Sequence, residues 1–196
     1  MDDVTEPPSR KGAARKIELL DATLRIIARD GLAGLSMRGL AAEAGAPLGA
    51  VSYYFAGKDE LVEAAFARHS EIEGERMAAM IRRVGAGTPD EAADAVADFV
   101  VEGCTVRRRQ LITEYELMVE SARRPALQES TAGWLRSLRA QMVEAMTALG
   151  SADPEIDARL LLAVISGLEV DSLADEPGPT QRDVVRSVLS RLRGAR

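Results

Sequence analysis

The chain has 196 residues, 46% of them hydrophobic, and a net charge of −6 at pH 7. This length allows one good core or two small domains, and the hydrophobic content is ordinary for a soluble globular protein. The single cysteine, Cys104, excludes an intramolecular disulfide framework, and we expect it in the core. Because aromatic residues make up only 4% and β-branched runs bounded by turns are absent, we predict an all-α fold.

Residues 1–9 are acidic and contain two prolines, so we predict a disordered arm there. This segment lacks the basic and apolar regions of a secretory signal. The longest apolar run, Leu160–Ile165, is too short to span a bilayer. We therefore expect a cytoplasmic protein with no membrane partner.

Residues 36–58 predict two short helices joined by a tight turn. Ser36 can cap the first helix through its hydroxyl, Gly45 suits the positive φ of a helix end, and Pro47 suits the first turn of the second helix. An amphipathic helix precedes them, with Ile17 and Ile27 in its apolar stripe. This pattern is typical of a helix-turn-helix that reads DNA, although an ordinary helical hairpin can contain the same turn.

The outward side of the second short helix bears small and hydroxyl-bearing side chains, which let a helix enter the major groove deeply. Tyr54 offers a phenol and Lys58 a charge for phosphate contact, whereas we assign Phe55 to the core. Residues 10–58 carry a net charge of +4 and residues 59–196 carry −7, which suits attraction of phosphates to the amino-terminal part. The outward residues are Gly49, Ala50, Ser52 and Tyr53.

A longer pattern surrounds this motif. It runs through Gly31, Leu35-Ser36-Met37-Arg38, Leu40-Ala41-x-x-Ala44-Gly45, Pro47-x-Gly49 and Tyr53-Tyr54-Phe55-x-x-Lys58-Asp59-Glu60-Leu61. With these residues, the segment 13–66 resembles the amino-terminal domain of the TetR family of bacterial repressors. The resemblance implies an all-α homodimer that binds a double-stranded DNA operator and carries a carboxy-terminal effector domain.

By the same resemblance, the motif residues divide into two groups. Many family members have a tyrosine where this chain has Ser52, and the shorter side chain changes which bases can be read there. The resemblance implies that phosphates are held by Ser36, Arg38, Tyr54 and Lys58, and that base edges are met by Gly49, Ala50, Ser52 and Tyr53.

The rest of the chain predicts six further helices. One runs from Lys58 or Asp59 to about residue 84, and another follows the cap Thr88. Arg107, Arg108 and Arg109 then interrupt the apolar pattern and predict a solvated segment; the alternative is that one of these arginines meets an anionic effector. Apolar periodicity returns over 110–122, 127–149, 154–174 and 180–194, with breaks at Pro125, Gly150 and residues 176–179. We divide the chain into an arm (1–9), a helix-turn-helix domain (10–57) and a helical ligand-binding and dimerisation domain (58–196).

The last two predicted helices are apolar and contain small residues that allow close approach. The family resemblance implies that such a pair meets its copy in a four-helix dimer interface, while the alternative is that both helices close the core of one chain. The candidate interface residues are Ile156, Leu160, Ala163, Gly167, Leu168, Val185, Val188 and Leu189.

Adaptable and amphipathic side chains gather on the middle helices, and pockets for small molecules are mostly apolar with a few polar groups. We predict a largely apolar small-molecule effector, with Glu114, Glu116 and Glu120 as possible polar groups, although the same residues suit a plain core. The candidate ligand-binding residues are Tyr115, Met118, Trp134, Met142 and Met146.

Catalytic and metal-binding patterns are missing from the sequence. His69 is the only histidine, we place it at the surface or a packing seam, and no Cys/His cluster, P-loop or GxGxxG occurs. We therefore expect no enzyme, metal or cofactor, and predict a ligand-responsive homodimeric repressor that binds a palindromic operator. The alternatives are a DNA-binding regulator without a small-molecule effector, and a helical sensor or enzyme with a vestigial helix-turn-helix.

Overall fold

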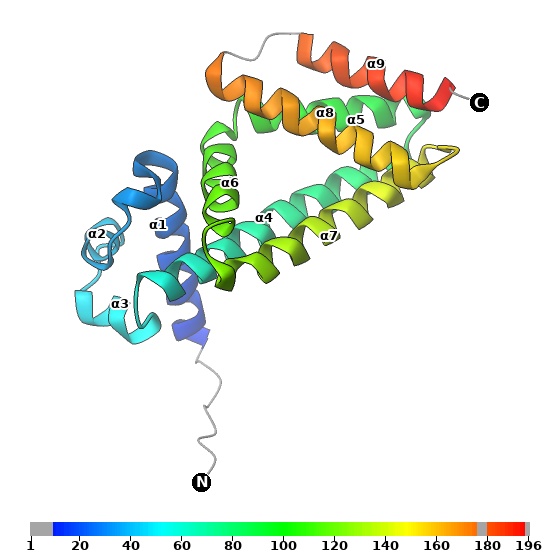
Figure 1. The fold of residues 1–196 in the computed structure, drawn as a ribbon. Helices are drawn as coiled ribbons and strands as arrows, with labels where there is room; N and C mark the ends of the chain where they lie inside the picture. The colour runs from blue at the N-terminus through cyan, green and yellow to red at the C-terminus, as the bar shows by residue number, and fades with distance from the viewer. Residues whose placement is uncertain (1–9, 176–179, 195–196) are drawn as a thin grey trace. The chain divides into compact units, whose positions relative to one another are not determined.

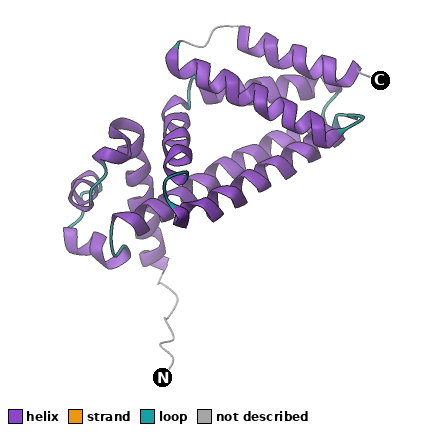
Figure 2. Ribbon diagram, viewed as in Figure 1, coloured by secondary structure: helices purple, strands orange, loops and turns teal. Residues whose placement is uncertain are grey.

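The structure is a computed structural model that describes residues 10–175 and 180–194. In these two ranges it consists of nine α-helices without a strand, which confirms the all-α prediction (Figures 1 and 2). The predicted arm (1–9) and the predicted break (176–179) lie outside the described residues. The helices are α1 (Arg10–Gly34), α2 (Met37–Glu43), α3 (Leu48–Tyr54), α4 (Lys58–Ala86), α5 (Pro89–Cys104), α6 (Arg108–Ser121), α7 (Pro125–Ala148), α8 (Pro154–Ala174) and α9 (Thr180–Gly194).

Several helices begin at a side chain that accepts a hydrogen bond from a free backbone N–H, or at a proline, which has no N–H to satisfy. The Thr88 hydroxyl accepts from the Glu91 backbone N–H at 3.4 Å, while a Glu91 carboxylate oxygen accepts from the Thr88 N–H at 2.7 Å. Asp153 caps α8 by accepting from the Ile156 N–H at 3.2 Å. Proline occupies the first position of α5, α7 and α8, where a missing N–H costs nothing.

The described chain separates into two compact units, residues 10–69 and 70–194. The boundary lies inside α4, because the first turns of that helix pack into the amino-terminal unit. Leu61, Val62, Ala65 and Phe66 are all buried there. The amino-terminal unit therefore extends about three helical turns beyond the predicted boundary at residue 57.

The core of the amino-terminal unit is small and aliphatic. The α1 residues Leu19, Ile26 and Ile27 are buried together with Leu40 of α2 and Val51 of α3. Helix α2 contacts both α1 and α3. Phe55, which follows α3, is 1% exposed, so its predicted place in the core is confirmed.

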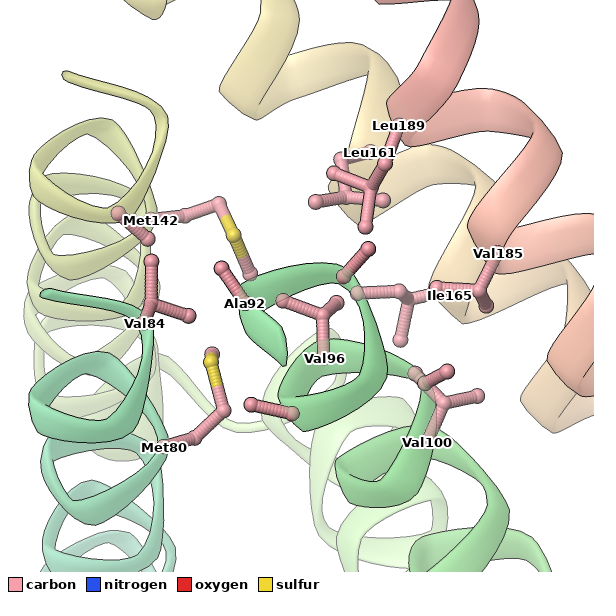
Figure 3. Close-up of a cluster of buried hydrophobic side chains, with 14 of the residues drawn as sticks. Met80, Val84, Ala92, Val96, Val100, Met142, Leu161, Ile165, Val185 and Leu189 are labelled. Atoms are coloured by element: carbon pink, nitrogen blue, oxygen red, sulfur yellow. The ribbon is translucent and has the colours of Figure 1, made fainter. Parts of the chain in front are cut away.

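The core of the second unit is a larger cluster in which α5 is the central helix. Met80 and Val84 of α4 lie on one side of Val96 of α5, and Ile165 of α8 lies on another (Figure 3). Helix α5 packs along α9, and α7 packs along α8. Cys104 is fully buried in this cluster, as predicted.

His69 is only 2% exposed, which rules out the surface and leaves the packing seam of its two expected placements. Two arginines differ from the sequence expectation. Arg107 and Arg108 are half-buried instead of solvated: Arg107 Nη2 lies 2.5 Å from Glu73 Oε1, and Arg108 Nη2 donates to the Leu173 carbonyl at 2.9 Å. A carboxylate and free carbonyls at the end of α8 provide the partners that the local sequence does not reveal. Across the described ranges, none of the helices is both long enough and apolar enough to cross a membrane.

Candidate functional site

The turn between α2 and α3 has the geometry that the sequence predicts. The Ser36 hydroxyl accepts from the Gly39 N–H at 3.0 Å and so caps α2. Gly45 has a φ of 56°, and the Ala46 N–H donates to the Ala41 carbonyl at 2.9 Å, which ends α2 in a glycine-dependent stop. Pro47 then stands at the N-cap of α3. The turn thereby connects two short helices that pack against each other.

Helix α3 presents a smooth outward face. Gly49, Ser52 and Tyr53 are exposed, and Tyr53 is 83% exposed, whereas Ala50 is half-buried. A side chain built at Gly49 would meet nothing within 4 Å, so this edge of the helix is open to an approaching surface. The rings of Tyr53 and Tyr54 meet edge to face at 5.1 Å, which gives the exposed phenol one fixed neighbour.

The basic side chains of the amino-terminal unit differ in whether they are already bound to other groups of the protein. Arg25 and Arg29 of α1 pair with Glu43 of α2 at 3.3 and 3.0 Å. Lys58 is half-buried and its Nζ donates to the Leu32 carbonyl at 2.8 Å. Arg38 is exposed and forms no ion pair with any residue that the structure describes, so its charge is free to meet a phosphate.

The second unit contains a cavity of about 220 Å³ that five helices line. Its wall is mostly apolar, with a few polar groups, as in sites for small organic molecules. The lining residues are Ser70, Glu73, Gly74, Arg76 and Met77 of α4, Phe99 of α5, Glu114, Tyr115 and Met118 of α6, Trp134, Leu135, Ser137, Leu138 and Gln141 of α7, and Leu162, Ile165, Ser166, Glu169 and Val170 of α8.

Burial strongly perturbs two polar groups of this cavity. Removal from water, followed by the nearby charge of Glu114, raises the pKa of Glu169 to about 8. Burial and the neighbouring Glu169 also raise the pKa of the Tyr115 phenol. The Tyr115 hydroxyl lies 3.2 Å from both Glu169 Oε2 and the Ser166 carbonyl oxygen. Such perturbed groups in a concave site are typical of a binding centre.

Three of the five predicted ligand-binding residues, Tyr115, Met118 and Trp134, line the cavity. Met142 and Met146 do not, because they are at most 1% exposed and belong to the core cluster. Sequence reasoning missed Glu169 and Arg76. A glutamate in the otherwise apolar run Leu168–Val170 was a usable signal for the first, whereas nothing in the sequence distinguishes Arg76 from a surface arginine.

A second, more open hollow of about 360 Å³ lies along α6. Glu116 and Glu120, expected as polar groups of the effector site, border this hollow, whereas Glu114 borders the enclosed cavity. Tyr115 borders both. The three glutamates therefore do not converge on one site.

The predicted interface residues divide between surface and core. Val185 and Leu189 are at most 1% exposed and pack inside the second unit, out of reach of another copy. Leu168 and Val188 are half-buried against the same core. The exposed members share one face of α8 and form an apolar stripe with Val170, at Ile156, Leu160, Ala163 and Gly167.

Comparison with known proteins assigns both units. Residues 19–65 match the family described as "Bacterial regulatory proteins, tetR family", and residues 87–195 match "Tetracyclin repressor-like, C-terminal domain". The nicotine-responsive transcriptional repressor HdnoR of Paenarthrobacter nicotinovorans is 27% identical, with 89% of this chain and 92% of HdnoR covered.

Solved structures give the same assignment. The TetR family member SCO1917 of Streptomyces coelicolor A3 superposes with a TM-score of 0.73 at 32% identity, covering 91% of this chain and 97% of that chain. The multidrug binding protein EbrR, in its complex with ethidium, superposes with a TM-score of 0.68 at 32% identity and the same two coverages. These relatives are regulatory or ligand-binding proteins, and the chain belongs to the TetR family of helix-turn-helix transcriptional regulators.

Proposed function

We propose that the chain is a homodimeric repressor in the cytoplasm that a small organic molecule releases from a palindromic operator. The observation that carries this proposal is the cavity in the second unit, which five helices line with apolar side chains and a few polar groups. HdnoR is named for its response to nicotine, and EbrR is described in complexes with ethidium and proflavin. Ligand and operator would compete through their different affinities for two arrangements of the protein.

Helix α3 would read the operator, with Gly49, Ala50, Ser52 and Tyr53 along base edges. The open edge at Gly49 and the 83% exposure of Tyr53 support this assignment. The operator should then be a near-palindrome whose half-site centres lie about one helical turn or somewhat more apart. Phosphates would be held by Ser36, Arg38, Tyr54 and Lys58.

The apolar stripe on α8 would form the dimer interface. Ile156 and Leu160 are each 49% exposed, and Ala163 and Gly167 between and beyond them permit close helix approach. An exposed apolar stripe on a regulator that needs two half-sites favours burial against a second copy.

Reciprocal binding measurements test the proposal. DNA selected from a random pool supplies the operator, and quenching of Trp134, the only tryptophan, reports cavity binding by compounds from an aromatic library. A compound that quenches Trp134 should weaken operator binding, and the operator should weaken compound binding by the same factor. The corresponding coupling free energy should be on the order of 1–3 kcal/mol. Trp134→Ala should lose the response while keeping operator affinity. Compounds that fill the cavity without changing operator affinity would contradict the proposal.

A further inference from the structure

The cavity lining contains more acidic than basic groups. Glu73, Glu114 and Glu169 contribute three carboxylates, and Arg76 contributes the one guanidinium. The remaining lining residues, including Phe99 and all those from α7, are uncharged. Carboxyl groups therefore outnumber cationic groups in the wall of the cavity.

Arg76 is already engaged by its surroundings. Its Nη1 lies 3.1 Å from Glu73 Oε2, its Nη2 donates to the Phe99 carbonyl, and its guanidinium carbon lies 3.7 Å from the centre of the Phe99 ring. Glu73 receives a second cation from Arg107 at 2.5 Å. Glu102 Oε2 also lies 3.8 Å from Arg76 Nε. Two carboxylates and two guanidinium groups therefore balance one another in this cluster, and the carboxyl groups of Glu114 and Glu169 lie outside it.

Glu169 is in a different situation. In the described ranges it forms no ion pair, and its hydrogen-bond partner is the neutral Tyr115 hydroxyl. A phenol has a single hydrogen, yet the Tyr115 oxygen lies 3.2 Å from both Glu169 and the Ser166 carbonyl. Both hydrogen bonds form together only when a protonated Glu169 donates to Tyr115 and Tyr115 donates to Ser166.

We propose that Glu169, supported by Glu114, recognises the positive charge of an organic monocation, and that this cation replaces a proton on Glu169. The assignment rests on the proposed function, since it names the effector of that same cavity. Met77, Met118 and the half-buried ring of Trp134 supply an apolar and aromatic wall, which suits a flat organic body and not a hydrated metal ion.

The proton balance follows from the groups that face Glu169. Burial and the charges of Glu114 and Glu73 raise its pKa to about 8, while Tyr115 and Arg76 act in the opposite direction. At pH 7 the Glu169 carboxyl is therefore mostly protonated. When the cation binds, the O–H bond of Glu169 breaks, the electron pair stays on the carboxylate, and the proton passes to the buffer. The Tyr115 hydrogen is then free to turn from Ser166 to Glu169.

The test compares two flat tricyclic probes on the full chain without DNA. Proflavin is a cation near neutral pH, and acridine is neutral there; quenching of Trp134 reports both. Proflavin should bind at least about tenfold more tightly than acridine. Its affinity should rise about tenfold between about pH 7 and pH 9, following the ionised fraction of a group with this pKa, whereas acridine affinity should stay constant. Calorimetry in phosphate and Tris buffers should reveal release of about one proton per proflavin at pH 7.

Two isosteric variants separate the possible outcomes. Glu169→Gln should lower proflavin affinity about tenfold and abolish both proton release and pH dependence, with acridine binding unchanged. Glu116→Gln, on the exposed side of α6, should change none of these. Equal binding of both probes, or full proton release in Glu169→Gln, would overturn the cation assignment and leave the cavity as the effector site. Failure of both probes to quench Trp134 would count against the cavity itself, and hence against the proposed function too.

Discussion

The two units expose their candidate functional groups in opposite ways. In the amino-terminal unit, Tyr53 and Gly49 lie on an open helix surface, and the core beneath them serves to hold that surface in place. In the second unit, Glu169 and Tyr115 lie inside a cavity, where removal from water alters their ionisation. Reading a duplex requires groups that reach outward, whereas recognising a small molecule requires groups enclosed by the protein. The following changes test how far this contrast holds.

The largest effect should come from Leu160→Glu. The change places a charge in the proposed dimer interface, so we expect a monomer of about 21 kDa by light scattering and an operator affinity lower by on the order of 100-fold or more. Val106→Glu introduces the same charge at an 83% exposed valine outside the stripe and should leave a dimer. A Leu160→Glu protein that remains a dimer would show that the interface lies at another surface.

Tyr53→Ala should reduce operator affinity by about 1–3 kcal/mol per half-site and relax base preference, because its exposed phenol would contact base edges. The fold should be unaffected, since the side chain is 83% exposed and touches chiefly Tyr54. Titrations against operator and random duplexes distinguish contact with base edges from contact with the DNA backbone. An equal loss on both would mean that Tyr53 contacts only the backbone of DNA.

Glu169→Gln should change the pH dependence of stability. Because the folded-state pKa of Glu169 is about 8, against an ordinary value of 4.5, the folded protein binds more protons between these values. The free energy of unfolding should therefore fall as pH rises through this window, by about 2 kcal/mol after allowance for solvent screening. The free energy of unfolding of the variant should depend less on pH, and at about pH 9 it should be higher than that of the parent. Denaturant titrations that give parallel pH profiles would show that Glu169 is well solvated.

The smallest effect should come from Lys58→Ala. If Lys58 contacts a phosphate, the variant should bind all sequences more weakly and reduce the salt dependence by about one unit per half-site. Its bond to the Leu32 carbonyl offers another role, whose loss would cost stability by about 1 kcal/mol. Arg38→Ala serves as the comparison, because that side chain is exposed and should affect DNA binding alone. An unchanged salt slope in Lys58→Ala would leave only the structural role.

Most helix ends could be predicted from residues close to them in the sequence. Capping by Thr88 and Asp153 and the stop at Gly45 depend on residues within one turn, so the sequence was sufficient to place those helix ends. The exposed face of α3 followed from the same periodicity. The unit boundary did not, because the burial of Leu61 and Phe66 depends on long-range packing that a helical period cannot reveal.

The cavity was predictable only in part. Periodicity shows that Met142 and Trp134 both face inward on α7, but not that one meets close-packed neighbours and the other an empty space. That difference depends on the spacing of five helices. Likewise, the partners of Arg107 lie on α4, and its burial could not be inferred from a run of three arginines.

Helix α8 contributes both to the cavity and to the exposed apolar stripe. Leu162, Ile165 and Glu169 border the cavity, the exposed stripe around Leu160 and Gly167 faces away from it, and Val170 at the edge of the stripe borders both. If that stripe is the dimer face, each cavity is separated from the two-fold axis by about one helix diameter, roughly 10 Å. Occupying one cavity would then shift α8 of that copy, and this helix would pack against α8 of the other copy in the proposed interface. Saturation curves for the effector should in that case depart from a simple hyperbola, with the two sites of a dimer sensing one another before DNA is involved.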